Sequence, residues 1–424
     1  MICITKRAIF LGMSSRNPRP ALLGALLFLL SACPSPEVTS DAGALVDAPS
    51  DAGAGAEDVG LDAPRADTGP DAGPPMGFEE ELDYWMNAGG LHGVAALARQ
   101  GERRVVAVRG LATETMPVDE HTLFNVASIS KTFVGALALQ EAEAGRLDLD
   151  ADVAPILGFD FQHPRHPSVA ITPRMLMTHT SGMVDDFLDL AVSDGDPSVS
   201  LESFARTYAA DPTHWGDAPG MTRSYCNACI AVLARVIEHT SSTDFRVASQ
   251  SRLFDPLALD GAGWFFGDVD SGRLAHFYTW APRRGYSELA LQGYPHYPAG
   301  MLMISLHGLE RWLLGHLAMG TLDGTRFLSE ASVGETQRVQ TPSVSRNQAL
   351  VWYYTTHAGL RWLSHSGSSF GASTQMLYRP EDGRMIVVLT NSDAYIRSRL
   401  GQSGGSDAID RIIERMNAEL ELSL

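Results

Sequence analysis

Lysine is almost absent from this chain. The one lysine that lies away from the N-terminus restricts how the sequence around it can fold. The sequence has thirty arginines but only two lysines, Lys6 and Lys131. Arginine stays protonated near neutral pH, whereas a lysine that is desolvated or lies beside other charges can lose its proton. Lys131 follows Ser128 by three residues, and residues i and i+3 of a helix lie on one face. The spacing therefore predicts a helix that brings the amine to the serine hydroxyl.

The Ser128–Lys131 pairing suits nucleophilic catalysis. A serine hydroxyl is a weak nucleophile until a neighbouring base takes its proton. Residues 134–144 favour a helix and Gly145 suits its C-cap, so Ser128 is expected at or near the helix N-terminus. Backbone N–H groups and the helix dipole favour developing negative charge there. Ser-x-x-Lys is a short pattern, however, and chance occurrence is the alternative.

The first 32 residues are typical of an export signal. Four basic residues precede a ten-residue apolar run over 21–30: Lys6, Arg7, Arg16 and Arg19. The run is too short for a comfortable membrane span and has the flanks of a signal peptide. It ends in Leu30-Ser31-Ala32-Cys33, which resembles the lipobox of bacterial lipoproteins and implies cleavage before Cys33 and its lipidation. An ordinary signal peptide followed by an incidental cysteine is the alternative, and translation could begin at Met1 or at Met13.

Residues 33–77 form an acidic segment that contains nine acidic residues and a single arginine. Few large apolar residues occur in it, so it cannot bury enough surface to offset its ordering entropy, and self-repulsion extends it. We expect a disordered tether that holds a globular domain, residues 78–424, off a membrane. By resemblance to lipoproteins, Pro34 after Cys33 lacks the aspartate that retains such proteins in the inner membrane. This favours the outer membrane or the cell surface.

The charge of the chain excludes some classes of function. The formal net charge is −18, which argues against nucleic-acid binding, because proteins of that class present a basic face. The same charge argues against peripheral attachment to anionic lipid. At 424 residues the chain could hold two or three domains, or one large catalytic unit.

Cys226 and Cys229 are the two cysteines of the globular part. No second pair and no histidine at ligand spacing accompanies them, which argues against a zinc site. A disulfide would suit an oxidising compartment, but so short a loop strains disulfide geometry. Two free, buried thiols at the start of a helix are therefore the favoured expectation.

The order of apolar segments predicts a mixed α/β (α+β) fold. Strand-like segments occur near both ends of the globular part: 93–99, 105–110, 349–355, 360–365, 373–378 and 385–391. Helical stretches with Pro- and Gly-rich connections fill residues 150 to about 290, and an amphipathic helix is expected over 407–422. We expect one antiparallel sheet, built from the N- and C-terminal parts and flanked by helices, with a mostly helical insertion.

Three local patterns occur in order along the chain: Ser128-Ile129-Ser130-Lys131, Tyr225-Cys226-Asn227 and His365-Ser366-Gly367. With the stretch from Leu176 to Gly182, they resemble the penicillin-recognising serine hydrolases. The most similar subgroup comprises class C β-lactamases, D-alanyl-D-alanine carboxypeptidases and related esterases. The resemblance covers roughly 80 to 420, and three motifs in family order are far more specific than one.

The resemblance implies a role for each motif residue. Ser128 would form an acyl-enzyme, and Lys131, with a pKa lowered by desolvation, would take or relay its proton. Tyr225 is a second candidate base, and the sequence leaves the choice between the two open. Asn227 would orient Lys131 and the substrate amide. The backbone N–H groups of Ser128 and Ser368 would form the oxyanion hole.

The third motif departs from the lactamase pattern, which usually has Lys-Thr-Gly where this chain has His365-Ser366-Gly367. A histidine could still bind a substrate carboxylate, but its charge would fade above neutral pH. Ser366, Gly367 and Ser368 would line the substrate, with Gly367 permitting close backbone approach. This departure weakens the case for efficient β-lactam hydrolysis and leaves acyl-enzyme chemistry untouched.

The sequence therefore favours an esterase or a D-amino-acid peptidase that needs no metal and no cofactor. The alternatives are a true β-lactamase and a catalytically silent, surface-anchored binding protein of the same fold. We expect His179 to be a hydrogen-bonded structural residue, and Asp185 and Asp186 to lie in a solvated loop. The natural substrate, the acyl acceptor (water or another amine) and the oligomeric state stay open.

Overall fold

The computed structural model describes residues 77–185, 193–402 and 404–422. The predicted signal peptide, the tether up to residue 76 and Cys33 lie outside these ranges. None of the helices within them has the length and hydropathy needed to cross a membrane.

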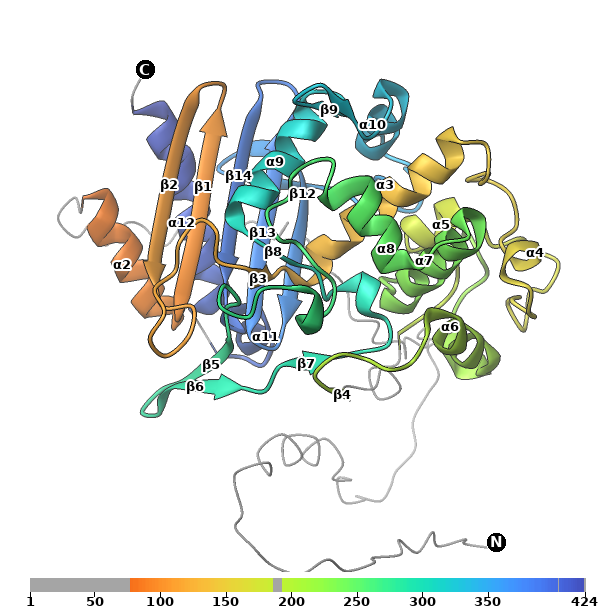
Figure 1. Cartoon of the computed structure of the whole chain (residues 1–424), viewed down its shortest axis with the longest axis horizontal. Helices are drawn as coiled ribbons and strands as arrows, with labels where there is room; N and C mark the ends of the chain where they lie inside the picture. The colour runs from red at the N-terminus through yellow and green to blue at the C-terminus, as the bar shows by residue number, and fades with distance from the viewer. Residues whose placement is uncertain (1–76, 186–192, 403, 423–424) are drawn as a thin grey trace, which may run out of the picture. The chain divides into compact units, whose positions relative to one another are not determined.

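A six-stranded antiparallel sheet forms the centre of the fold, with the strand order β11-β12-β13-β14-β1-β2 (Figure 1). Its strands are β1 (Gly93–Gln100), β2 (Arg103–Gly110), β11 (Tyr353–His357), β12 (Leu360–Ser369), β13 (Ala372–Arg379) and β14 (Arg384–Thr390). Ala96 of β1 lies opposite Val388 of β14 and Ala107 of β2. The sheet thus joins the N- and C-terminal parts of the domain, which confirms the predicted architecture.

Both faces of the sheet are covered. Successive residues of a strand point to opposite sides, so each strand contributes side chains to both faces. Val94, Ala96 and Ala98 of β1 pack in one core cluster with α2 (Phe78–Gly89) and α12 (Gly405–Glu421). Ala95 and Leu97 belong to the larger cluster with α3 (Ser130–Glu143) and α9 (Leu306–Leu317). This two-sided burial explains why the sequence of β1 reads as a continuous apolar run rather than an alternating one.

The segment between β2 and β11 is mostly helical, as expected. Its remaining helices are α4 (Ala154–Leu157), α5 (Pro173–Met177), α6 (Leu201–Ala210), α7 (Asn227–Ser241), α8 (Phe245–Ser249) and α10 (Glu330–Gln337), while α11 (Ala394–Arg399) follows the sheet. Short strands are β3 (Phe124–Asn125), β4 (Ser193–Asp194), β7 (Gln292–Gly293), β8 (Met303–Ile304), β9 (Thr321–Leu322) and β10 (Thr325–Arg326). A hairpin of β5 (Phe277–Ala281) and β6 (Gly285–Leu289), which the sequence analysis did not predict, projects below the body in Figure 1.

Cys226 and Cys229 form a disulfide, so the expectation of two free thiols is wrong. Cys226 is the extended N-cap residue of α7, and Cys229 lies in the first turn of that helix. The change from extended to helical backbone leaves their Cα atoms 5.4 Å apart, within the usual range for a disulfide. A loop of four residues is therefore long enough when a helix begins inside it.

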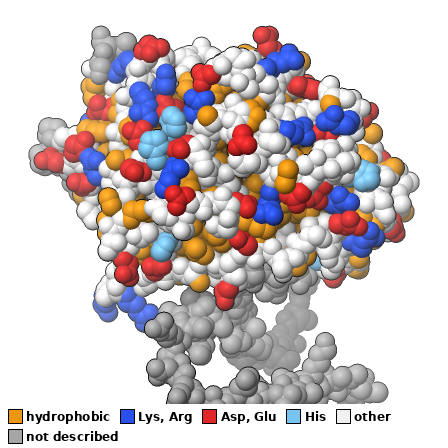
Figure 2. All heavy atoms as spheres, in the orientation of Figure 1, with side chains coloured by type: hydrophobic (Ala, Val, Ile, Leu, Met, Phe, Trp, Pro, Cys, Tyr) orange, Lys and Arg blue, Asp and Glu red, His pale blue; other side chains and the backbone are white. Residues whose placement is uncertain are grey.

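Acidic and basic side chains are interspersed over the face drawn in Figure 2. No broad area of one sign stands out on that face. The surface in view thus lacks the basic stripe that a nucleic-acid-binding protein would present.

Candidate active site

Ser128 lies on a single 3₁₀ turn, Ala127–Ile129, directly before α3, as the sequence predicted. Ala127 has φ = +46°, a left-handed conformation that a residue with a Cβ rarely adopts. The side chain of Asn125 supports it, because its Oδ1 accepts the Ala127 N–H at 2.9 Å. The Asn125 amide also donates to the Gly300 carbonyl at 3.2 Å. Asn125 thus joins the nucleophile turn to a second segment of the site.

Ser130 provides another tie between these two segments. Its hydroxyl donates to the Ala127 carbonyl at 2.6 Å and accepts the Leu302 N–H at 3.1 Å. The side chain is fully buried, so both bonds lie away from water. The second serine of the Ser-Ile-Ser-Lys motif is therefore structural, and it fixes the turn that carries the first.

Lys131 lies in the first turn of α3 with its side chain fully buried. Its Nζ is 2.9 Å from Ser128 Oγ and 2.6 Å from the carbonyl oxygen of Ala299. A neutral amine in this position can donate one N–H to Ala299 and keep its lone pair for the serine proton. The structure therefore brings Ser128 and Lys131 together in the arrangement predicted from their spacing.

Tyr225 lies beside the amine, with the centre of its ring 5.0 Å from Lys131 Nζ. The ring of His179 is another neighbour of the Tyr225 ring, and the two ring centres are 4.5 Å apart. Asn227 is the first residue of α7, and its side-chain amide donates to a carboxylate oxygen of Asp185 at 2.7 Å. Tyr225 thus lies beside Lys131, while Asn227 is bound to Asp185, on whose carboxylate the charge of Lys131 acts.

Asp185 does not lie in a solvated loop, so that expectation is wrong. Its carboxylate accepts the backbone N–H groups of Asn227 and Ala228 as well as the Asn227 amide. Burial raises the pKa of Asp185, while these hydrogen bonds and the charge of Lys131 oppose the rise. Asp186 lies outside the described residues.

The third motif lies on β12, next to the nucleophile turn. A Cβ placed on Gly367 would fall 2.2 Å from the Val126 carbonyl oxygen and 2.2 Å from Thr374 Oγ1. Glycine is therefore required because β12 packs directly on the segment that precedes Ser128. This contact brings the backbone of Ser368 toward the turn. Ser366 is held by Tyr353, whose hydroxyl accepts the Ser366 N–H at 2.8 Å and lies 2.6 Å from its Oγ.

His365 is buried and neutral, which corrects the expectation of a charge that fades above neutral pH. Burial, reinforced by the charge of Lys131, lowers the pKa of His365 to about 3. Its Nδ1 lies 2.7 Å from the Ser366 carbonyl, which can only accept, so Nδ1 carries the proton. Nε2 is then an acceptor, and it is buried without a hydrogen-bond partner among the described residues. His365 therefore offers a substrate no positive charge.

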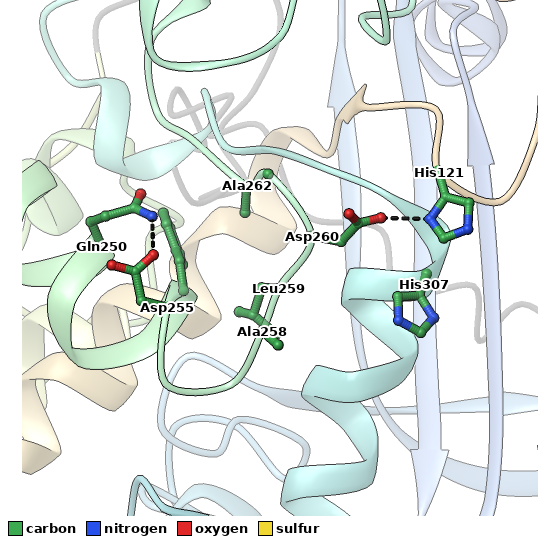
Figure 3. A pocket seen from close by; sticks show the side chains of 10 residues that line it. His121, Gln250, Asp255, Ala258, Leu259, Asp260, Ala262 and His307 are labelled. Carbon is green, nitrogen blue, oxygen red and sulfur yellow. Dashed lines mark hydrogen bonds and ion pairs between the residues drawn. The ribbon is translucent and has the colours of Figure 1, made fainter.

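A separate recess of about 440 Å³ lies beside residues 250–262, and its lining contains none of the predicted site residues. Figure 3 shows His121 paired with Asp260 in its wall, at 2.6 Å, with His307 nearby. In the described part of the chain, no three metal-ligating side chains cluster together. We assign this recess no catalytic role.

Sequence reasoning missed Asn125, Ser130, Ala299 and Asp185 as parts of the site. Ala299 acts through its backbone carbonyl, so its side chain carries no signal. Asn125 and Asp185 lie next to recognisable motifs, but each works by a contact that depends on the folded chain. Asn125 bonds the backbone two residues ahead and Ser130 bonds it three residues back, and both are known side-chain-to-backbone patterns.

Comparisons with known proteins find similar sequences. The Beta-lactamase family model matches residues 78–403. Penicillin-binding protein 4 of Amycolatopsis lactamdurans is 27% identical over 289 residues, which cover 65% of this chain and 73% of that protein. Esterase EstB of Burkholderia gladioli is 31% identical over 186 residues, covering 40% of this chain and 46% of EstB, so the match spans about half of that relative.

Solved structures share the fold. The D-amino acid amidase from Ochrobactrum anthropi SV3, crystallised with L-phenylalanine amide, has a TM-score of 0.66 at 19% identity, covering 81% of this chain and 98% of that chain. A penicillin-binding protein from Bacillus halodurans has a TM-score of 0.62 at 21% identity, over 81% of this chain and 99% of that one. At these identities the likeness concerns the fold alone.

Proposed function

The chain belongs to the beta-lactamase family of serine hydrolases, and we propose that it cleaves a carboxylic ester or an amide through an acyl-enzyme on Ser128. The contact that carries this proposal is the 2.9 Å distance between Lys131 Nζ and Ser128 Oγ. The fully buried amine is anchored on the Ala299 carbonyl, which aims it at one hydroxyl. A base within hydrogen-bond reach of the nucleophile is the first requirement for acyl transfer.

The reaction begins when Ser128 Oγ attacks the substrate carbonyl carbon and its proton passes to Lys131. The negative charge moves to the carbonyl oxygen, where the backbone N–H groups of Ser128 and Ser368 would bind it. Collapse of this intermediate breaks the bond to the leaving group, which takes up the proton. Tyr225, with its ring 5.0 Å from the amine, could relay that proton. Water then attacks the acyl-enzyme by the reverse proton path.

The third motif favours simple esters and amides over β-lactams. Lactamases usually place a lysine where this chain has His365, and burial keeps His365 neutral. A substrate carboxylate would meet the charge of Arg223, which acts on His365, but none from the histidine. Relatives named as an esterase and as a penicillin-binding protein are consistent with acyl chemistry on varied substrates.

A substrate panel tests the proposed function. Purified protein should hydrolyse p-nitrophenyl esters or D-amino-acid amides, with a lower kcat/KM for D-Ala-D-Ala peptides and for a chromogenic cephalosporin. Faster turnover of the cephalosporin than of any ester or amide would identify a β-lactamase instead. No turnover of any of these compounds, together with no covalent labelling by a fluorescent penicillin, would point to a silent binding protein.

We also propose that the domain is exported and anchored to the cell envelope through a lipid on Cys33. The basic region, the apolar run and the Leu30-Ser31-Ala32-Cys33 sequence support this proposal. Metabolic labelling with a fatty-acid analogue should mark the wild-type protein in the outer membrane or at the cell surface, and should not mark a Cys33→Ser variant. An unlabelled wild-type protein would contradict lipidation.

A further inference from the structure

We infer that residues 179–185 act as a clasp that positions Tyr225 and Asn227 for catalysis, with His179 and Asp185 as its two positioning residues. This inference deepens the proposed function and rests on it. The clasp is defined by hydrogen bonds to four backbone N–H groups within residues 224–228. It joins the second motif to a segment that lies more than forty residues earlier in the chain.

The clasp provides hydrogen-bond acceptors for successive backbone N–H groups at and just before the start of α7. The His179 carbonyl accepts the Ser224 N–H at 2.9 Å, and His179 Nδ1 accepts the Cys226 N–H at 3.2 Å. The Asp185 carboxylate then accepts the Asn227 N–H at 2.7 Å and the Ala228 N–H at 3.1 Å. The first N–H groups of a helix have no partner within the helix, so these acceptors complete the N-terminus of α7 from outside.

Asp185 does more than cap the helix, because it also holds the functional side chain of Asn227. The Asn227 amide nitrogen donates to Asp185 Oδ2 at 2.7 Å. A carboxylate can only accept hydrogen bonds, so this contact fixes which end of the amide is NH₂. The carbonyl end of Asn227 is then left as an acceptor for the ammonium of Lys131 or for a substrate amide.

The backbone conformation and the protonation state of His179 also suit it to hold the start of α7. It has φ = +60°, a left-handed conformation in which asparagine and aspartate are tolerated better than most residues. Burial and the nearby charges of Arg223 and Lys131 hold the pKa of His179 well below its ordinary value, so its ring is neutral. Because Nδ1 accepts the Cys226 N–H, the ring proton is on Nε2. The centre of the His179 ring also lies 4.5 Å from that of Tyr225.

The test compares two aspartates that both cap helices. Asp244 is the N-cap of α8 and accepts the N–H groups of Arg246 and Val247, and no predicted site residue is among its partners. Asp244→Asn should change Tm little, because asparagine caps a helix about as well as aspartate and one oxygen accepts both N–H groups. Asp185→Asn should lower Tm by a few degrees, because both oxygens of Asp185 accept N–H groups and the new NH₂ would face a donor. Only Asp185→Asn should also lower kcat on the best ester, by about 10- to 100-fold, because misplacement of catalytic groups by ~1 Å has effects of that size.

The results of this test distinguish a failure of the clasp from a failure of the proposed function. Equal kcat values for Asp185→Asn, Asp244→Asn and the wild type would overturn the clasp while leaving the hydrolase intact. A wild-type protein whose turnover does not depend on Ser128 would overturn the proposed function itself.

A second pair of variants keeps the clasp falsifiable if Asp185→Asn fails to fold. His179→Asn retains an acceptor and suits the left-handed backbone, whereas His179→Ala removes the acceptor. The Asn variant should keep at least about ten times the kcat of the Ala variant. Equal kcat values in the two would contradict positioning through the Cys226 N–H.

Discussion

Replacing Ser128 with alanine is expected to lower kcat/KM for the best ester or amide by about 10⁴-fold or more, because it removes the hydroxyl that lies 2.9 Å from Lys131 Nζ. The protein should still fold. The nucleophile turn is held by Asn125 and Ser130, and the Ser128 hydroxyl is not part of either tie. Steady-state kinetics and thermal unfolding of the same preparation would measure both properties.

Ser251→Ala is the matched control for this substitution. Ser251 also bears a hydroxyl on a helical segment, where it donates to the Val247 carbonyl, and it lies on the exposed surface. Its loss should leave kcat/KM unchanged. If Ser128→Ala retained more than a tenth of the wild-type rate, Ser128 would not be the nucleophile.

Replacing Lys131 with arginine is expected to reduce kcat/KM by about 10³-fold, although the formal charge is preserved. A guanidinium does not release its proton near neutral pH, so it cannot take the proton of Ser128. The larger group must also fit a fully buried site that holds one amine against the Ala299 carbonyl. Acylation measured in a single turnover with a fluorescent penicillin or an activated ester would report the step concerned.

Two controls show whether Lys131→Arg loses activity because proton transfer is lost. Arg206→Lys, the reverse exchange on the surface of α6, should leave the rate unchanged, since Arg206 is exposed and pairs with Glu202, away from the site. Raising the pH to 9 should not restore Lys131→Arg, because a guanidinium keeps its proton at that pH. Full activity in a folded Lys131→Arg protein would exclude proton transfer by Lys131.

The sheet and the three motifs could be predicted because their signals are local. The strands are short apolar segments bounded by turn residues, and Ser128 and Lys131 are neighbours on one helix. The environment of His365 could not be predicted in the same way, because its neutrality comes from burial between segments that meet only in the folded chain. The roles of His179 and Asp185 depend on the same kind of distant contact. The Cys226–Cys229 disulfide was missed because spacing alone does not show that a helix begins between the two residues.

The pairing of β1 with β14 has a consequence for when this domain can fold. Val94 lies opposite Thr390, so the centre of the sheet brings together residues from the two ends of the domain. A ribosome must release nearly the whole domain before this pair can form, and closing so long a loop is slow. The strand that completes the catalytic turn, β12, also lies late in the chain. During synthesis the unfinished polypeptide therefore stays without its central sheet and without a working nucleophile, an open state that would suit the export proposed above.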